Sequence, residues 1–261
     1  QVKAHLTGLF ETAVKAADPA HCLPAHLPPP PKGRTVVIGA GKAAASMARA
    51  VERHWHGELT GLVVTRYDHG LDCDRIEVIE AAHPVPDQKG IDAAARILEA
   101  VQDLTPDDLV LFLASGGGSA LLTMPSAGIS LGDKQDLNRA LLRSGANITE
   151  MNTVRKHLSA IKGGRLALAA SPAKVVTLAI SDVPGDDPAV IASGPTVGDA
   201  STIADAIAIL EKYGITPAPS IVDTLRQPTA ETPFPGDPHL AHCTFRMIAT
   251  PMGALEAVKS E

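Results

Sequence analysis

The sequence is poor in aromatic side chains, which make up 3% of its residues. Proteins that hold single-stranded nucleic acid stack bases on aromatic rings, so this scarcity argues against such a function. The sequence also lacks a basic tract, and its formal net charge is -6 at pH 7. Because nucleic-acid binding depends on clustered Lys and Arg, we expect no nucleic acid among the partners.

Cysteine pairs and long apolar runs are missing as well. Cys22, Cys73 and Cys243 are isolated, with no CxxC pair, so the sequence indicates neither a structural zinc site nor a disulfide framework. No apolar run approaches the roughly 20 residues of a membrane-spanning helix, and no signal-peptide pattern is present. We therefore expect no membrane partner and a reducing, cytoplasmic location.

Aliphatic side chains take the place of the aromatic ones. Hydrophobic residues make up 45% of the 261 residues and charged residues 20%, which is typical of a globular protein. Short apolar runs alternate with segments of helical periodicity along the chain. This alternation predicts an α/β fold with a mainly parallel sheet and right-handed crossovers.

Three of the apolar runs end in residues that can bind a ligand. The run at 35–38 leads into Gly39-Ala40-Gly41-Lys42, the run at 110–114 into Ser115-Gly116-Gly117-Gly118-Ser119, and the run at 174–180 into Ser181-Asp182 followed by Asp186-Asp187. In an open parallel sheet, ligands bind beyond the carboxyl ends of the strands, near a switch in strand order. The three strand ends therefore predict one shared crevice.

The Gly-rich segment between Ser115 and Ser119 predicts a cradle for a phosphate or carboxylate. Glycine lets the backbone approach a ligand closely, and free backbone N–H groups favour an anion. A tight turn that needs glycine only for its geometry is the alternative, and a Gly-rich strand end by itself does not decide between the two.

Lys42 could neutralise a phosphate or a charge that develops during a reaction. Alternatively, it is an exposed lysine at a helix start, although a cation there opposes the helix dipole. The segment around it is not a Walker A loop, which requires Gly-x-x-x-x-Gly-Lys-Ser/Thr. Ala44 occupies the third glycine position of Gly-x-Gly-x-x-Gly, so the dinucleotide-binding pattern is incomplete.

Other polar groups suit the same chemistry. Asp182, Asp186 and Asp187 follow a strand, where carboxylates commonly hold magnesium beside phosphates, although each could equally serve the turn around Pro184-Gly185. Arg155, Lys156, His157 and Lys162 form a cationic set for a carboxylate or a nucleotide phosphate, or else a solvated helix face. His83 is either a proton carrier or a hydrogen-bonded loop histidine.

These motifs, in this order, resemble those of the class II glycerate 2-kinases, the MOFRL-type enzymes often labelled hydroxypyruvate reductase. The resemblance extends from the first helix to about residue 199 and is weaker beyond. The segments that carry it are Gly39-Ala40-Gly41-Lys42-Ala43, Glu80-Ala81-Ala82-His83-Pro84-Val85-Pro86-Asp87, Ser115-Gly116-Gly117-Gly118-Ser119-Ala120-Leu121-Leu122, Asn152-Thr153-Val154-Arg155-Lys156-His157-Leu158-Ser159, Lys162-Gly163-Gly164-Arg165-Leu166-Ala167, Ser181-Asp182-Val183-Pro184-Gly185-Asp186-Asp187 and Ser193-Gly194-Pro195-Thr196.

The resemblance implies ATP-dependent, Mg²⁺-requiring phosphorylation of D-glycerate at its 2-hydroxyl, giving 2-phosphoglycerate. It implies a Rossmann-like three-layer α/β/α sandwich facing a smaller C-terminal domain. Lys42 matches the family's catalytic lysine, and we add Asp182 as catalytic and as a metal ligand with Asp186 and Asp187. The residues assigned to substrate or nucleotide binding are Gly39, Gly41, Ser115, Gly116, Gly117, Gly118, Ser119, Asn152, Arg155, Lys156 and Lys162.

The resemblance also sets the expected domain organisation. Residues 1–226 are predicted to form the kinase domain, the proline-rich residues 227–240 a linker, and residues 241–261 the start of a C-terminal domain whose remainder is missing. A catalytic arginine is expected from that missing part, because its motif is not found here. The partners expected are a hydroxy acid and a nucleotide, and the oligomeric state is left open, with a homodimer as one possibility.

Two other functions stay open. One is a nicotinamide-dependent hydroxypyruvate reductase, which the incomplete glycine pattern and the lack of a clear acidic ribose-binding residue on the second strand oppose. The other is a non-catalytic module that binds a sugar acid.

Overall fold

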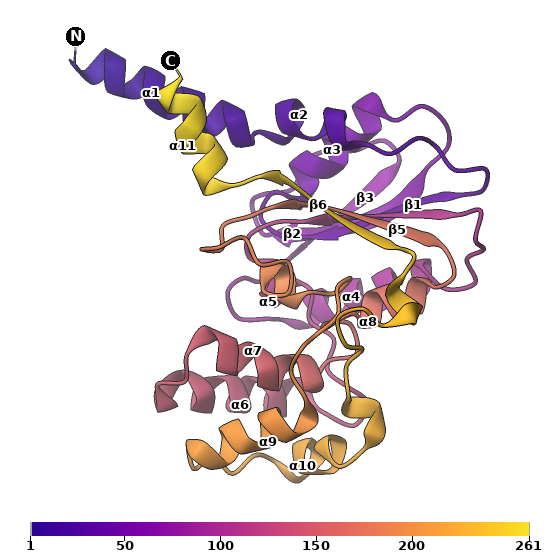
Figure 1. Cartoon of the computed structure of the whole chain (residues 1–261), viewed down its shortest axis with the longest axis vertical. Coiled ribbons are helices and arrows are strands. Elements are labelled where there is room, and N and C mark those ends of the chain that lie inside the picture. The colour runs from indigo at the N-terminus through magenta and orange to yellow at the C-terminus, as the bar shows by residue number, and fades with distance from the viewer. Residues whose placement is uncertain (1, 261) are drawn as a thin grey trace.

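The computed structural model describes residues 2–260 and is built around one six-stranded sheet (Figure 1). The sheet order is β3-β2-β1-β4-β5-β6, and every neighbouring pair is parallel. The strands are β1 (Thr35–Ala40), β2 (Thr60–Arg66), β3 (Ile76–Ala81), β4 (Leu109–Ala114), β5 (Lys174–Ile180) and β6 (Cys243–Ala249). The predicted parallel α/β fold is confirmed.

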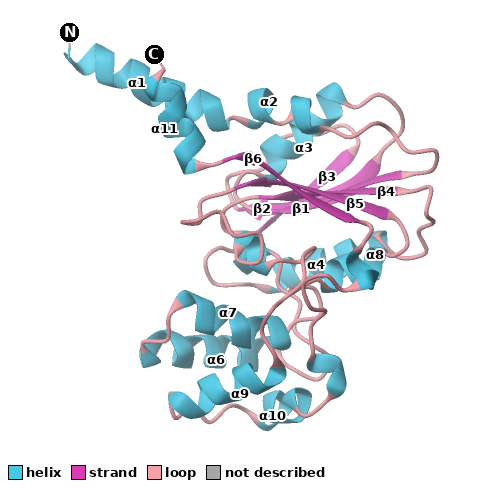
Figure 2. Ribbon diagram, in the orientation of Figure 1, coloured by secondary structure: helices cyan, strands magenta, loops and turns pink. Residues whose placement is uncertain are grey.

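Helices cover both faces of the sheet (Figure 2). One face carries α2 (Pro19–Cys22) and α3 (Ala44–His54), and above them α1 (Val2–Ala17) lies against α11 (Pro251–Lys259). The other face carries α4 (Gln88–Ala100), α5 (Gly118–Leu121) and α8 (Arg165–Ala170) (Figure 1). This arrangement is the expected three-layer α/β/α sandwich.

The central strands β1 and β4 are apolar apart from Thr35, and both of their faces are covered. Every residue of β1 and β4 is buried. Side chains alternate across the sheet, so Val36 and Ile38 join the core beneath α4 and α8, whereas Val37 joins the core beneath α3. Burial on both faces explains why the two strands appear in the sequence as continuous apolar runs.

A separate helical lobe lies below the sandwich in Figure 1. It consists of α6 (Leu131–Ser144), α7 (Ile148–His157), α9 (Ile203–Lys212) and α10 (Pro219–Leu225), which share their own apolar core. Reciprocal capping boxes begin α6, α7 and α9. Because a capping box satisfies two orphan backbone donors at each start, the local sequence fixes where these helices begin.

The sheet continues through the segment where the sequence predicts a second domain. β6 pairs with β5, with Val175 opposite Cys243, so residues 243–249 extend the same sheet as the first five strands. Residues 227–240 run from the helical lobe back to that edge (Figure 1). No helix within residues 2–260 combines the length and apolarity needed to cross a membrane.

Candidate active site

The strand order reverses between β1 and β4, and the loops that leave these two strands are joined directly. The backbone N–H of Lys42 donates to the carbonyl of Gly116 at 2.8 Å, and the N–H of Ala43 donates to Ser115 Oγ at 3.1 Å. The crevice beyond such a reversal is where open parallel sheets bind ligands. The first two predicted strand ends therefore meet.

Two glycines make this close approach feasible. Gly41 has a φ of +140°, and a Cβ there would collide with the Ser115 hydroxyl and lie 2.6 Å from the Ser115 carbonyl oxygen. Gly117 has a φ of +84°, and a Cβ there would lie 2.9 Å from His83 Nε2 and 3.4 Å from Lys42 Cγ. The glycines are needed because side chains would fill the space in which the lysine and the histidine approach the loop.

The third predicted strand end reaches the same crevice. Asp182 follows β5, and its Oδ2 atom lies 3.8 Å from Lys42 Nζ. The side chains of Lys42 and Asp182 are 42% and 58% exposed, so water screens their attraction and both remain accessible to a ligand. A Cβ on Gly116 would collide with the Asp182 carboxylate. Gly116 therefore lies between the loop that carries Lys42 and the loop that carries Asp182.

The two serines of the Gly-rich loop have partners within the protein. Ser115 is buried, and its hydroxyl is the acceptor that links β4 to Ala43. Ser119 Oγ lies 2.6 Å from Ser193 Oγ and accepts a hydrogen bond from Lys162 Nζ at 2.9 Å. Lys162 Nζ also donates to the Ser119 carbonyl. Both hydroxyls therefore hold the loop in place.

A small cationic pocket adjoins the Gly-rich loop. Its volume is about 180 Å³, and Lys134, Arg155 and Lys162 supply three basic side chains to its wall. Lys134 and Lys162 are 9% and 1% exposed. Within residues 2–260, no carboxylate lies within ion-pair distance of any of the three. The remaining lining residues are His83, Pro84, Pro86, Gly117, Ser119, Ala120, Thr123 and Asn138.

Burial makes this pocket electrostatically unusual. It lowers the pKa of Lys134 to about 8, with Arg155 contributing further, and it lowers the pKa of Lys162 well below the ordinary lysine value, helped by Lys134, Arg155 and Lys156. The pKa of His83 is also lowered, first by burial and then by the nearby Lys42 and Arg66. An anion in the pocket would offset this cost of desolvated positive charge.

Other predicted cationic residues are engaged elsewhere. Lys156 Nζ donates to Asp199 Oδ1 at 3.3 Å, and both side chains are buried. His157 is also buried, and its Nδ1 lies 2.9 Å from the carbonyl oxygen of Ala230. Asn152 is buried on α7 but is not among the residues that line the cationic pocket. These three side chains are therefore not on a solvated face, because all three are buried within α7.

The two remaining predicted glycines lie near the carboxyl ends of β1 and β4. Gly39 is within β1, where a Cβ would lie 2.6 Å from the Leu113 carbonyl oxygen of β4. Gly118 begins α5, and a Cβ there would lie 2.9 Å from the Ala40 carbonyl oxygen and from Ala192 Cβ. Both positions therefore keep neighbouring segments close to the crevice.

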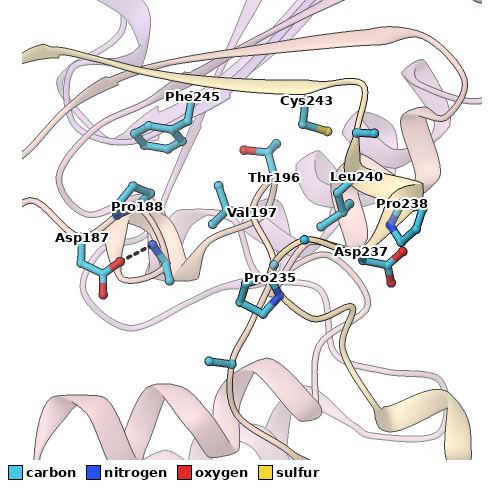
Figure 3. A pocket seen from close by; sticks show the side chains of 15 residues that line it. Asp187, Pro188, Thr196, Val197, Pro235, Asp237, Pro238, Leu240, Cys243 and Phe245 are labelled. Carbon is cyan, nitrogen blue, oxygen red and sulfur yellow. Dashed lines mark hydrogen bonds between the residues drawn. The ribbon is translucent and has the colours of Figure 1, made fainter.

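The remaining two aspartates lie on the turn after Asp182. Asp187 Oδ1 accepts a hydrogen bond from the N–H of Ala189 at 2.9 Å, and Asp187 lines a larger groove of about 740 Å³ beside β6 (Figure 3). Asp186 has a φ of +53°, and its buried Oδ1 atom has no hydrogen-bond partner. No group of three or more His, Cys, Asp or Glu side chains within residues 2–260 is arranged to hold a metal ion.

Sequence reasoning missed two residues of the cationic pocket. Lys134 and Asn138 are four residues apart on α6, so they lie on one helix face. Asn138 Oδ1 accepts a hydrogen bond from Arg155 Nε at 2.9 Å, which orients the guanidinium. The i, i+4 spacing was a signal in the sequence, but the polar composition of α6 makes a solvated face the more natural interpretation.

Known proteins similar to this chain carry two kinds of name, hydroxypyruvate reductase and glycerate kinase. A protein of Agrobacterium vitis named as a hydroxypyruvate reductase is 56% identical over 253 residues, which are 97% of this chain and 57% of that protein. The D-glycerate 2-kinase of Thermotoga maritima is 43% identical over 254 residues, which are 97% of this chain and 59% of that protein. A crystal structure of glycerate kinase from Thermotoga maritima matches with a TM-score of 0.90 at 42% identity, over 99% of this chain and 61% of that chain.

The chain thus spans a little under two thirds of the length of these relatives. Its residues 5–226 match the family model described as a domain of unknown function, DUF4147. With that match and the shared fold, the chain belongs to the DUF4147 family.

Proposed function

We propose that this chain provides the kinase domain of an ATP-dependent glycerate 2-kinase, which phosphorylates D-glycerate to 2-phosphoglycerate. The observation that carries the proposal is the meeting of Lys42, Asp182 and the Gly-rich loop at the sheet reversal, beside a pocket with three basic side chains. The relative from Thermotoga maritima that is named D-glycerate 2-kinase supports this choice of substrate.

Lys42 is positioned to neutralise negative charge on the transferred phosphoryl group. Its side chain is accessible from the crevice, and its backbone is fixed by the hydrogen bond to Gly116. In phosphoryl transfer, positioning and charge stabilisation supply most of the rate enhancement. A lysine held at a strand end by neighbouring backbone provides both.

Asp182 is the residue best placed to hold Mg²⁺. Mg²⁺ is usually bound by one or two carboxylates together with substrate phosphates, so a three-carboxylate cage is not required. The exposed carboxylate of Asp182 fits this need, and the unpaired Oδ1 atom of Asp186 on the same turn is a second candidate ligand. The bound ion would supply charge neutralisation at the phosphates.

We further propose that residues 1–226 need a second domain for full activity. The relatives named glycerate kinase extend well beyond the region matched here, and the catalytic arginine expected from the family resemblance is not found in this chain. Glycerate phosphorylation measured for the 261-residue chain alone, and for this chain fused to the remaining part of the Thermotoga maritima relative, tests this dependence.

A coupled assay for ADP release with D-glycerate, ATP and Mg²⁺ tests the proposed activity. Release of ADP only when glycerate is present, with 2-phosphoglycerate as the product, is the expected result. The name of the Agrobacterium vitis relative makes a hydroxypyruvate reductase the second candidate. Oxidation of NADH or NADPH on addition of hydroxypyruvate, without glycerate-dependent ADP release, would show that the chain is a reductase and not a kinase. Binding of glycerate with neither reaction would favour a binding module.

A further inference from the structure

The cationic pocket beside the Gly-rich loop contains more positive charge than the protein balances. Lys134 is nine-tenths buried and lines the pocket, and within residues 2–260 its Nζ atom has neither a hydrogen bond nor an ion pair, whereas its backbone N–H donates to the Ser130 carbonyl at the start of α6. Arg155 and Lys162 line the same small space. Burying an unpaired charge is costly, so a protein retains one where a ligand supplies the missing charge.

The size of the pocket limits that ligand. Its volume of about 180 Å³ is below the range of about 300–1,000 Å³ that is typical of sites for drug-sized ligands and cofactors. A nucleoside triphosphate is therefore too large to be enclosed there, whereas a three-carbon acid is small enough. The Lys42 and Asp182 side of the crevice, which is open to solvent, remains for the nucleotide phosphates.

The donors in the pocket suit a carboxylate. Arg155 donates a hydrogen bond from its Nε atom to Asn138 Oδ1. The two terminal guanidinium nitrogens of Arg155 are therefore left for a planar anion with two oxygens, such as a carboxylate. Lys162 is fixed by its hydrogen bonds to Ser119, and Lys134 reaches the space from α6. His83 and Gly117, which also line the pocket, adjoin Lys42. An acid bound here by its carboxylate would keep its hydroxyl on the side of Lys42.

From this arrangement we infer that Lys134, together with Arg155 and Lys162, binds the carboxylate of the hydroxy acid, and that Lys134 determines the preference for acids over uncharged polyols. The inference rests on the proposed function, whose acceptor site it specifies. It assigns the acid to the enclosed pocket and the nucleotide to the open crevice, and it makes Lys134 a substrate-binding residue.

Calorimetric titration of the 261-residue chain with D-glycerate, in the absence of nucleotide, tests the inference. D-glycerate is expected to bind and glycerol, which lacks the carboxylate, is not. Lys134→Met is expected to weaken glycerate binding by roughly 10- to 150-fold, the range for losing a hydrogen bond to a charged group. ATP titrated separately should bind the variant as tightly as the parent chain.

Arg143→Met is the matched control. It removes the same charge from the same helix, but Arg143 is exposed and lies nine residues, roughly 13 Å, further along α6. At an ionic strength of 0.1 M the Debye length is about 10 Å, so this change should leave glycerate binding nearly unaltered.

Thermal melting distinguishes a ligand-binding lysine from a structural one, because replacing a structural lysine would lower the melting temperature. Because Lys134→Met replaces an unpaired buried cation by an apolar side chain of similar length, the ligand-free variant should melt at a higher temperature than the parent chain. Unchanged glycerate binding by the variant, or loss of ATP binding with glycerate binding retained, would overturn the inference. Binding of glycerate that depends on Lys134, in a protein that releases no ADP, would overturn the kinase activity but not this acid site.

Discussion

Lys42 Nζ lies 3.8 Å from Asp182 Oδ2, although the two residues follow strands that are not neighbours in the sheet. β4 lies between β1 and β5, and the two side chains approach each other past its end at Gly116. A side chain at Gly116 would occupy the position of the Asp182 carboxylate. Lys42 and Asp182 can therefore approach each other only because Gly116, at the end of β4, has no side chain.

Replacement of Lys42 tests its assignment to phosphoryl transfer. Lys42→Met should lower kcat for glycerate phosphorylation by about 100- to 1,000-fold, the range seen when one group that stabilises transition-state charge is removed. Steady-state kinetics of glycerate phosphorylation measure the effect, and circular dichroism checks the fold. Lys174→Met is a suitable control, because Lys174 is exposed at the opposite, amino end of β5. Equal losses in both variants would contradict the role of Lys42.

Two aspartates on one turn can be compared as magnesium ligands. Asp182→Asn should raise the Mg²⁺ concentration needed for half-maximal activity, since it removes the exposed carboxylate beside Lys42. Asp187→Asn should shift this concentration much less, because Asp187 Oδ1 already accepts the Ala189 N–H. Activity measured as a function of Mg²⁺ concentration separates the two. If Asp187→Asn raised the required Mg²⁺ concentration more than Asp182→Asn, the metal ligand would be Asp187 rather than Asp182.

Gly116→Ala tests the space between Lys42 and Asp182. The added Cβ would collide with the Asp182 carboxylate, so we expect the carboxylate to move and activity to fall while the backbone φ remains acceptable. Gly8→Ala is the opposite case, because a Cβ there meets nothing within 4 Å and Gly8 lies inside α1. That change should raise the free energy of unfolding by about 0.5–1 kcal/mol, which a denaturant titration measures. A fully active Gly116→Ala variant would show that Asp182 is not constrained by this glycine.

The affinity for the acid should depend on pH through Lys134. Burial, with Arg155 contributing, lowers the pKa of Lys134 to about 8 in the free protein, and the groups facing it are Arg155, Lys162 and His83. A bound carboxylate raises this pKa, so binding near pH 8 takes up protons and weakens as the pH rises above 8. Calorimetry in two buffers of different ionisation enthalpy measures the uptake. In Lys134→Met the uptake assigned to this residue should vanish, and its persistence would assign the proton to another group.

Acid stability should depend on Asp108, which joins β4 to the segment before β1. Burial alone raises the pKa of Asp108, but hydrogen bonds donated by Thr105 and Arg34 outweigh it and hold the pKa at about 2. Because the folded pKa is below the unfolded value, this contribution is present above about pH 4 and is lost as the pH falls towards 2, and it amounts to about 2 kcal/mol. Urea unfolding from pH 6 to pH 2 measures the loss. In Asp108→Asn that part of the pH dependence should disappear; an unaltered profile would assign the acid sensitivity to other carboxylates.

The sequence by itself determined the chemistry at the strand ends. Continuous apolar runs bounded by glycine identify buried parallel strands, and parallel strands place their carboxyl ends at one edge. The sequence alone therefore assigns Lys42, Gly116 and Asp182 to one crevice. The capping boxes likewise fixed the starts of α6, α7 and α9 locally.

Only the tertiary structure decided which basic side chains line the cationic pocket. Lys156 and Arg155 are adjacent in the sequence, yet Lys156 is paired with Asp199 while Arg155 is held by Asn138 at the pocket. Lys134 could not be recognised, since a lysine in a polar helix is usually solvated. Lys134 lines a pocket with residues of the loops after β3 and β4, and its neighbour Gln135 donates to the Pro86 carbonyl. Such long-range packing leaves no periodic signal in the local sequence.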